Sequence, residues 1–392
     1  MTKTVAVIGA GITGLCSAYY LARQGYSVGV YESERYVAMK TSYANGGQIS
    51  VSNSEVWNTW SNVKKVIRWM FTKNAPLLIR PRWDLAQWRW MIKFLWYTVC
   101  GSYSTNTAKT IKLGLQSREL YRHIIADEGI EFDQRDSGIL HFYKDPHYWQ
   151  RAREVKDLYN NNGLEWDLLT AQQVQTKFQG LEDIRGVVGG TWTESDFTGD
   201  IHKFCQELAQ VLKNRYDVSF FYNHTIKDVE HLGFYDAVVV ANGVGSTALA
   251  KKVGDSIDVY PVKGYSITIN NVDPEHLPQV SLLDDQAKIV TSSLGNRFRV
   301  AGTAELAGEN YDIRRDRVQP LLDWVHENFP QINTHDYTQW ACLRPMTPNM
   351  MPVIKQSAKN PRVFYNTGHG HLGWTLGPAT GLRVAQLIKE QI

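Results

Sequence analysis

The sequence lacks the features that mark several specialised classes of protein. Its four cysteines are scattered and form no C-x-x-C pair, which argues against a disulfide framework or a cysteine-based zinc site. It has no run of roughly 18 apolar residues, the length that a membrane-spanning helix needs. The net charge is +3 and no block of Lys and Arg is present, so we expect no nucleic-acid partner. What remains is a globular protein whose 392 residues are enough for two domains.

The cysteines and the beginning of the chain also bear on location. The first strand-like run begins by Thr4, which leaves no room for a signal peptide, and the cysteine pattern fits reduced thiols. We therefore expect a cytoplasmic protein. The sequence shows no internal repeats and no low-complexity segment.

Tryptophan, by contrast, is concentrated in one part of the chain. Seven of the 13 Trp residues lie between Trp57 and Trp96. The stretch Trp88–Tyr97 predicts a helix that is apolar nearly all round, with Arg89 and Lys93 as its polar stripe. Because hydrophobic helices usually belong to a core, burial in the second domain is the first interpretation. The alternative is contact with a membrane surface or a protein partner, where Trp beside Lys and Arg is common.

The first 32 residues carry the pattern of a dinucleotide-binding unit. An apolar run at 5–8 leads into a G-x-G-x-x-G turn, and a second apolar run ends at Glu32. The glycines permit a tight turn, a close approach of pyrophosphate to the backbone and close packing of the following helix. The helix start offers N–H groups to phosphates, and Glu32 is spaced to accept hydrogen bonds from a ribose. The residues expected to contact the cofactor here are Gly9, Gly11, Ile12, Thr13, Gly14 and Glu32.

Two kinds of strand pattern follow. Alternation at 138–143, 264–269 and 297–301 predicts an antiparallel sheet, whereas the continuous apolar run at 236–243 predicts a buried parallel strand. A further strand and a Gly-rich loop at 363–373 lead to a last helix, expected from about Pro378.

These patterns predict a mixed α/β (α+β) fold with two domains. A Rossmann-like domain is assembled from separated segments, and a substrate domain with a mainly antiparallel sheet and helices is inserted between them. The expected segments are 1–56, 196–262 and 336–392 for the cofactor domain, and 57–195 and 263–335 for the substrate domain. Because an NAD domain usually arrives as one continuous unit, the separated segments favour FAD.

The chain resembles the D-amino-acid oxidase superfamily of FAD-dependent oxidoreductases, and within it the bacterial D-amino-acid dehydrogenases of the small-subunit type. The matching stretches occur in order along nearly the whole chain. They are Gly9–Gly14, Thr41–Ser50, Ala86–Trp90, Gly138–Tyr143, Val259–Ser266, Arg299–Gly308, Leu343–Pro348 and Asn366–Thr375.

The resemblance implies oxidative deamination of amino acids, chiefly D-amino acids, by hydride transfer to FAD, with electrons passed to a quinone or another acceptor. One alternative is an oxygen-using amine oxidase of the glycine or sarcosine oxidase type. Another is a non-catalytic flavin-binding subunit of a larger complex. In the leading hypothesis the Trp-rich segment contacts the inner face of the membrane or an electron-accepting partner.

The resemblance also assigns candidate substrate residues. Arg344 matches the arginine that binds the substrate carboxylate, and its planar guanidinium suits that role. Tyr265 is expected to donate a second hydrogen bond to the carboxylate. Tyr143 and His141 alternate on one strand and are expected to face the substrate. Gln48 is expected to contact flavin or substrate.

Two Gly-rich loops are expected to hold the flavin. Their backbone N–H groups and the N-terminus of the last helix suit an electron-rich ring. The candidates are Ser42, Asn45, Gly46, Gly47, Gln48 and Ile49 in the first loop, Gly368, His369, Gly370, His371 and Leu372 in the second, and Gly243 after the buried strand. We expect no metal, because His369 and His371 have no third ligand nearby.

The sequence departs from the dehydrogenase pattern beside this site. Cys342, Asn349 and Met350 replace Gly, Asp and Gly, and His371 stands where a smaller or uncharged residue is usual. The identity of the substrate is therefore not inherited with the resemblance. Cys342 also aligns with the cysteine that holds flavin covalently in related sarcosine oxidases. We expect non-covalent FAD, with attachment at Cys342 as the alternative.

Overall fold

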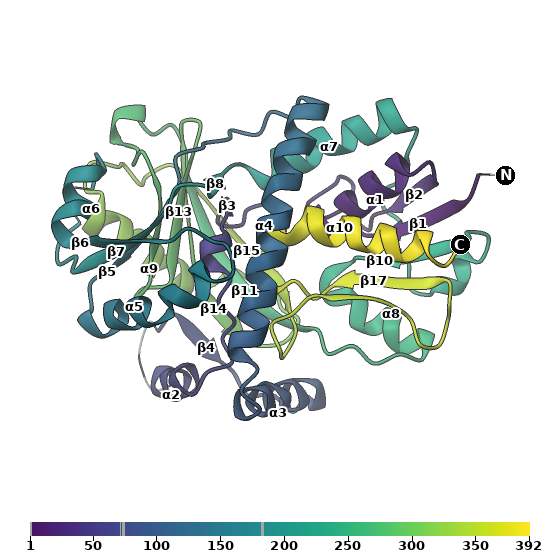
Figure 1. The fold of residues 1–392 in the computed structure, drawn as a ribbon, viewed down its shortest axis with the longest axis horizontal. Coiled ribbons are helices and arrows are strands. Elements are labelled where there is room, and N and C mark those ends of the chain that lie inside the picture. Colours follow the sequence, from purple (N-terminus) through teal and green to yellow (C-terminus); the bar gives the residue numbers. More distant parts are fainter. Residues whose placement is uncertain (1, 71, 73–74, 182–183) are drawn as a thin grey trace.

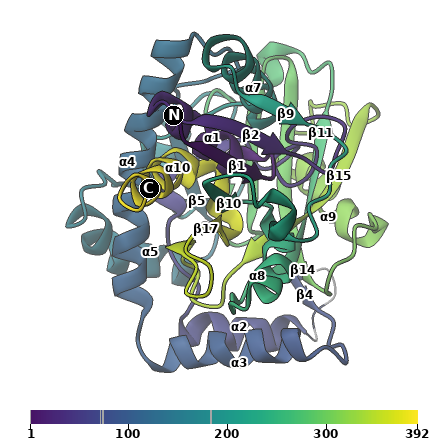
Figure 2. The same cartoon turned by 90° about the vertical axis from the view of Figure 1, so that its right-hand side faces the viewer.

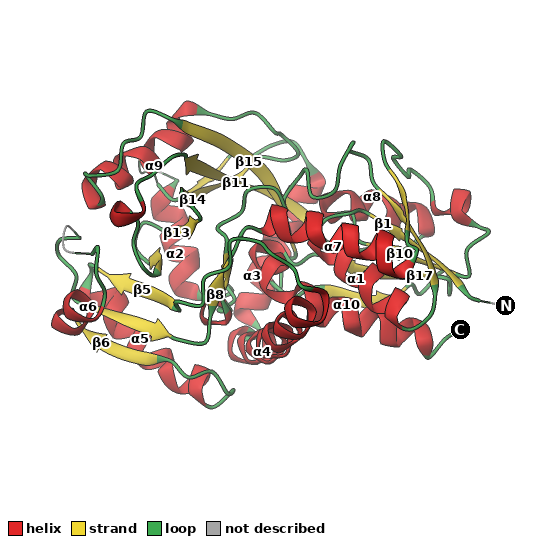
Figure 3. Cartoon of the chain, turned by 90° about the horizontal axis from the view of Figure 1, so that it is seen from above, coloured by secondary structure: helices red, strands yellow, loops and turns green. Residues whose placement is uncertain are grey.

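The computed structural model describes residues 2–70, 72, 75–181 and 184–392. Two sheets occupy opposite ends of the molecule, and the long helix α4 (Tyr103–Glu128) runs between them (Figure 1). Seen from above, the strands form two separate groups (Figure 3). The predicted mixed α/β fold is confirmed.

The first sheet is the Rossmann-like one. Its strand order is β16-β17-β10-β1-β2-β9, and all neighbours are parallel except β16 and β17. The strands are β1 (Thr4–Ile8), β2 (Ser27–Tyr31), β9 (Ser219–Phe221), β10 (Ala237–Val240), β16 (Val353–Gln356) and β17 (Val363–Thr367). Every one of them comes from the three segments expected for the cofactor domain.

Alternating residues of these strands fill two cores. Val5 and Val7 face one layer, whereas Ala6 and Ile8 face the other. Burial on both sides explains why β10 is apolar throughout. The first layer contains α1 (Ile12–Arg23), α7 (Ile201–Tyr216) and α10 (Gly373–Lys389), and the second contains α8 (Ser246–Val253). Helix α10 begins five residues before the expected start at Pro378, which lies inside it.

The second sheet is larger and mainly antiparallel. Its order is β15-β11-β14-β13-β12-β5-β7-β6, with β4 paired to β14, and only β12–β5 and β14–β4 are parallel. The strands are β4 (Leu77–Ile79), β5 (Ile139–Tyr143), β6 (Asp167–Thr170), β7 (Gly189–Thr193), β11 (Tyr260–Ile269), β12 (Ser281–Asp284), β13 (Ile289–Leu294), β14 (Arg297–Leu306) and β15 (Tyr337–Met346). Strand β15 thus lies in this sheet, although its sequence falls within the third segment expected for the cofactor domain.

Helices cover the larger sheet. On one face, α9 (Arg315–Asn328) packs against residues such as Ile267 and Val300. The remaining helices are α2 (Trp60–Trp69), α3 (Leu85–Val99), α5 (Pro146–Asn160) and α6 (Ala171–Lys177). A short pair, β3 (Gln48–Ile49) with β8 (Phe197–Thr198), joins the first Gly-rich loop to the segment before α7.

Helix α3 corrects the prediction of a buried helix. Only Gln87 and Thr98 of α3 are fully buried, and the helix lies beside α2 along one edge of the molecule (Figure 2). Its inner face packs on β11 and β15, and Trp90 Nε1 donates to the Met346 carbonyl at 2.9 Å. Its outer face exposes an apolar stripe made of Leu85, Trp88, Ile92, Leu95, Trp96 and Val99. Within the described part of the chain, no helix is long and apolar enough to cross a membrane.

Candidate active site

The glycines of the first turn are needed for steric reasons. Gly9 has a φ of +102°, and a Cβ at Gly14 would lie 1.9 Å from the Gly9 carbonyl oxygen. Among the described residues no side chain caps α1 at Gly11, so apart from the N–H of Ile12 the helix start remains open to a phosphate. Ser42 Oγ accepts from the N–H of Ile12 at 3.1 Å and joins the first loop to this turn.

Glu32 is held at the end of β2. Its carboxylate accepts hydrogen bonds from the backbone N–H of Ala10 at 2.7 Å and of Glu34 at 3.0 Å. These bonds fix the carboxylate beside the Gly9–Gly14 turn. The turn, the uncapped helix and the fixed acid together fit the adenosine end of FAD, and Thr13 lies in the first turn of the same helix.

The first Gly-rich loop packs closely against β13. A Cβ at Gly46 would lie 2.5 Å from Val290 Cγ2, and Gly47 has a φ of +73° with Ser292 Oγ close by. Asn45 Oδ1 accepts from the Gly47 N–H at 2.9 Å. These contacts leave room for glycine alone and fix the path of the loop between the two sheets.

Gln48 ends this loop, and its amide is already engaged. Its Nε2 donates to Ser281 Oγ at 2.8 Å and to the Leu282 carbonyl at 3.1 Å. The structure therefore uses the Gln48 amide nitrogen to join β3 to β12, and Ile49 is fully buried beside it.

The second Gly-rich loop precedes α10. Gly368 and Gly370 have positive φ values of +75° and +59°, and in the described part of the chain no side chain caps α10 at Leu372. His369 Nε2 lies 3.0 Å from Thr380 Oγ1, and burial lowers the pKa of His369 to about 3. Burial thus favours the neutral ring of His369, and its Nε2 is engaged by Thr380. Gly243, with a φ of +60°, lies in the turn after β10.

Arg344 has no partner among the described residues. Neither a hydrogen bond nor an ion pair joins its guanidinium to another group, and burial lowers its pKa to about 10. The guanidinium lies flat against β11, because a Cβ at Gly264 would fall 2.3 Å from Arg344 Cζ. A desolvated cation without a counter-ion is costly unless a ligand supplies the negative charge.

His371 lies near Arg344. Its ring stacks on Trp57 with centroids 4.9 Å apart, and both ring nitrogens are buried without a hydrogen-bond partner among the residues that the structure describes. Burial, followed by the charge of Arg344, lowers the pKa of His371 to about 4. Arg344, His371 and Trp57 therefore present one cation and one neutral imidazole with free hydrogen-bonding capacity.

His141 and Tyr143 share one face of β5, as the alternation predicted. His141 Nε2 lies 3.0 Å from the hydroxyl of Ser52, and burial lowers the pKa of His141 to about 4. Tyr143 is buried beside Trp149, and burial raises the pKa of its phenol. Neither side chain contacts Arg344 directly.

Tyr265 is not brought to Arg344. It lies on the opposite face of β11, in the core beneath α9, and its hydroxyl donates to Glu305 Oε2 at 2.8 Å. Neighbouring residues of a strand point to opposite faces, so Gly264 and Tyr265 cannot both face the substrate. The structure therefore does not place the Tyr265 hydroxyl beside Arg344, where the substrate carboxylate is expected.

Sequence reasoning missed Gly264 and Trp57. The signal for Gly264 was available, because a glycine next to the expected Tyr265 leaves a gap on the other face of the strand. Trp57 gave no such signal, since its stacking partner His371 lies far along the chain. In the part of the chain that the structure describes, no three His, Cys, Asp or Glu side chains are arranged to hold a metal ion.

Comparison with known proteins agrees with a flavin-dependent enzyme. The sequence profile of the family described as FAD dependent oxidoreductase (DAO) matches residues 4–387. The chain belongs to this family, the D-amino-acid oxidase superfamily of oxidoreductases. It is 44% identical to D-amino acid dehydrogenase 3 of Mesorhizobium japonicum, over 99% of this chain and 97% of the relative. It is 36% identical to D-amino acid dehydrogenase of Dechloromonas aromatica, over 98% and 96%.

Solved structures support the fold. Glycine oxidase of Geobacillus kaustophilus aligns with a TM-score of 0.77 at 19% identity, covering 100% of this chain and 96% of that one. L-proline dehydrogenase of P. horikoshii aligns with a TM-score of 0.75 at 15% identity, covering 100% and 94%. The chain is an FAD-dependent oxidoreductase, as the sequence indicated.

Proposed function

We propose that this enzyme deaminates D-amino acids oxidatively, giving 2-oxo acids and ammonia, and passes the electrons to a quinone or another acceptor. The observation that carries the proposal is the unpaired guanidinium of Arg344 on β15, which suits a substrate carboxylate. The names of the relatives support the amino acid and its D configuration.

The residues of the chain have separate parts in this reaction. Arg344 binds the carboxylate through two parallel hydrogen bonds, and Gly264 provides the flat surface on which the guanidinium lies. His371 remains neutral at physiological pH and offers one ring N–H and one acceptor nitrogen beside the bound substrate. FAD, when bound, accepts the hydride from the α-carbon. We assign no general base, because a substrate bound with a neutral amine needs none.

Anaerobic bleaching of the flavin tests this function. D-amino acids should bleach the flavin of the purified holoenzyme, while L-amino acids and N-methylated amines should not. Bleaching by glycine or sarcosine alone, with hydrogen peroxide formed in air, would instead assign the oxygen-using amine oxidase. A flavoprotein that no amine bleaches would be the non-catalytic subunit.

FAD is proposed to bind without a covalent bond. Burial raises the pKa of the Cys342 thiol, and its Sγ lies 3.5 Å from Thr41 Oγ1. A protonated thiol is a poor nucleophile toward the flavin ring. Acid precipitation checks this, because non-covalent FAD stays in the supernatant and covalent FAD is found with the protein.

The proposed location is the cytoplasm with peripheral contact to the inner face of the membrane through the Trp-rich segment 57–96. The support is the outer face of α3, where Leu85 and Trp96 are 88% and 64% exposed, and the neighbouring fully exposed Trp83. Such a stripe, with Trp at the boundary, suits the interface of a bilayer and the delivery of electrons to a membrane quinone.

Flotation with lipid vesicles tests the membrane contact. The holoenzyme should float with the vesicles, whereas a variant carrying Ile92→Ser and Trp96→Ser should remain in the soluble fraction. Equal distribution of the two proteins would exclude α3 as the contact.

A further inference from the structure

A cavity of about 470 Å³ opens where the chain passes from β4 to α3. It is lined on one side by Arg80, Pro81 and Arg82, and on the other by Glu305 and the loop that follows β14. It lies on the face of the sheet opposite Arg344, because Lys263 and Glu305 point to the side of Tyr265. The cavity is therefore separate from the candidate active site.

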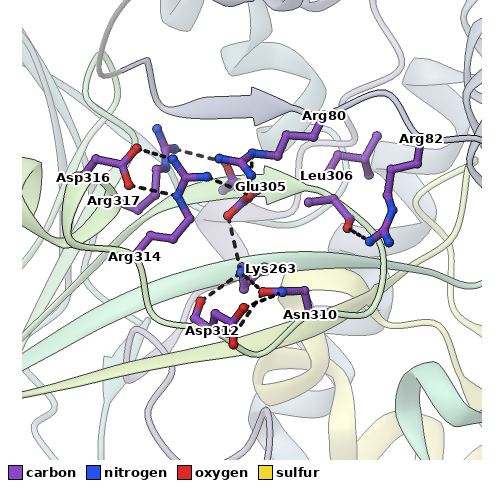
Figure 4. A network of polar contacts seen from close by, with 12 residues as sticks. Arg80, Arg82, Lys263, Glu305, Leu306, Asn310, Asp312, Arg314, Asp316 and Arg317 are labelled. Carbon is purple, nitrogen blue, oxygen red and sulfur yellow. Dashed lines mark hydrogen bonds and ion pairs between the residues drawn. The ribbon is translucent and has the colours of Figure 1, made fainter.

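Cations outnumber carboxylates around this cavity (Figure 4). Glu305 is fully buried and lies 3.2 Å from Arg80, 3.5 Å from Lys263 and 3.8 Å from Arg314. Arg314 also pairs with Asp316, and the Asp312 carboxylate accepts a hydrogen bond from Asn310 at 2.8 Å. With Arg82, and with Arg317 close to Glu305, five cations stand beside these three carboxylates. The charge that remains is positive.

The two arginines before α3 retain unused donors. Arg80 Nε lies 3.2 Å from the Glu305 carboxylate, and Arg82 donates through Nη1 to the Ala307 carbonyl at 2.6 Å. Within the described residues, no hydrogen bond is made by Nη1 or Nη2 of Arg80 or by Nε or Nη2 of Arg82. Two guanidinium groups with free N–H bonds suit the oxygens of a phosphate.

The backbone that carries these arginines is fixed. The fully buried Gln87 accepts from the Arg82 N–H at 2.8 Å and donates to the carbonyls of Arg80 at 3.1 Å and Leu306 at 3.2 Å. Pro81 restricts the chain between them. A pair of arginines on a rigid backbone loses little conformational freedom when it binds a ligand.

The same arginines adjoin the apolar stripe of α3. Arg82 is followed by Trp83, and Trp88 Nε1 donates to the Arg82 carbonyl at 2.9 Å. If α3 lies in the interface of a bilayer, the guanidinium groups stand at the level of the phosphates. The positive charges of Arg80 and Arg82 would then face the negative charges of the lipid head groups.

We propose that Arg80 and Arg82 form a binding site for a phosphate ester, and that the head group of an anionic phospholipid occupies it. The head-group assignment depends on the proposed membrane contact of α3. It does not depend on the substrate or on the electron acceptor.

Vesicle binding of the holoenzyme tests the proposal. One set of vesicles contains phosphatidylglycerol in phosphatidylcholine, and the other contains phosphatidylcholine alone. The variant combines Arg80→Gln with Arg82→Gln. The control combines Arg383→Gln with Lys389→Gln, which removes two exposed charges from α10 at the other end of the molecule.

The arginine variant should lose about 30-fold in affinity for phosphatidylglycerol vesicles, from two charges near the surface, and should keep its affinity for phosphatidylcholine. The control should behave as the unmodified enzyme. Arg82→Gln alone, which leaves the contacts of Glu305 intact, should lose part of the preference. An equal loss of affinity in the control would show that only the net charge of the protein matters, and it would overturn the proposed site at Arg80 and Arg82.

A second measurement separates the two sources of phosphate. Soluble glycerol phosphate is added to the holoenzyme and thermal unfolding is followed. Stabilisation of the enzyme but not of the arginine variant, without any preference for phosphatidylglycerol vesicles, would assign the cavity to a soluble ester and overturn the head group. The absence of both effects would overturn the phosphate site altogether, while bleaching of the flavin by D-amino acids would still support the proposed function.

Discussion

On one face of β11 and β15 the guanidinium of Arg344 has no counter-ion among the described residues, while on the other face of β11 and β14 three cations share the carboxylate of Glu305. The two groups are separated by a single sheet. The buried pair of Glu305 and Lys263 is satisfied within the protein, which suits a structural role. Arg344 is satisfied only when an anion arrives, which suits binding. On one face the protein supplies the negative charge through Glu305, whereas on the other face a bound anion must supply it.

The largest expected effect follows removal of the unpaired charge. Arg344→Lys should lower kcat/KM about 100-fold, because one charge-assisted hydrogen bond and the planar geometry are lost, and Arg344→Met should lower it further. Steady-state kinetics with a D-amino acid measures this, with Arg383→Met at an exposed position of α10 as control. An unchanged kcat/KM in Arg344→Met would show that Arg344 does not bind the substrate carboxylate.

Glu305→Gln should have the largest effect on stability. It leaves the buried ammonium of Lys263 with only Asn310 Oδ1 and the Asp312 carbonyl, and should cost about 3 kcal/mol in the free energy of unfolding. Denaturant unfolding measures the cost. Asp316→Asn, at an exposed partner of Arg314, should cost less than about 1 kcal/mol. Equal costs would show that Glu305 is not the centre of the cluster.

Gly264→Ala tests the role of the Arg344 face of the sheet without changing any charge. The φ of Gly264 is not positive, so the new methyl group acts by displacing the Arg344 guanidinium. KM should rise about tenfold, equivalent to about 1.4 kcal/mol, with a smaller change in kcat. In the double variant with Arg344→Met, the alanine should add nothing, because both changes act on one guanidinium. Additive effects would mean that Gly264 acts elsewhere.

Local patterns predicted the cofactor half well. The strand, the glycines and Glu32 lie within 32 residues, so spacing alone fixed the unit, and the alternation of His141 and Tyr143 placed both on one face. Arg344 was found from the resemblance, but its lack of a partner could not be, because it depends on every element around it.

The prediction that α3 is buried failed for a different reason. Periodicity identified the helix and its polar stripe but not which side the protein covers. Arg89 and Lys93, expected to form its polar stripe, both pair with Asp258, which turns the apolar stripe outward. A contact between residues so far apart in the sequence is decided by the fold and leaves no local signal.

Tyr265→Phe gives the smallest expected effect on activity and the most direct test of which face of the sheet Tyr265 serves. The register shift between Gly264 and Tyr265, and the bond to Glu305 across the strand pair, place its hydroxyl in the structural cluster. Loss of that bond should cost about 1–2 kcal/mol in unfolding free energy and leave kcat/KM within about twofold of the unmodified enzyme. Thermal unfolding and steady-state kinetics on the same preparation separate the two outcomes. A large loss in kcat/KM with unchanged stability would return Tyr265 to the substrate, because only a hydroxyl that touches the carboxylate changes the reaction without changing the fold.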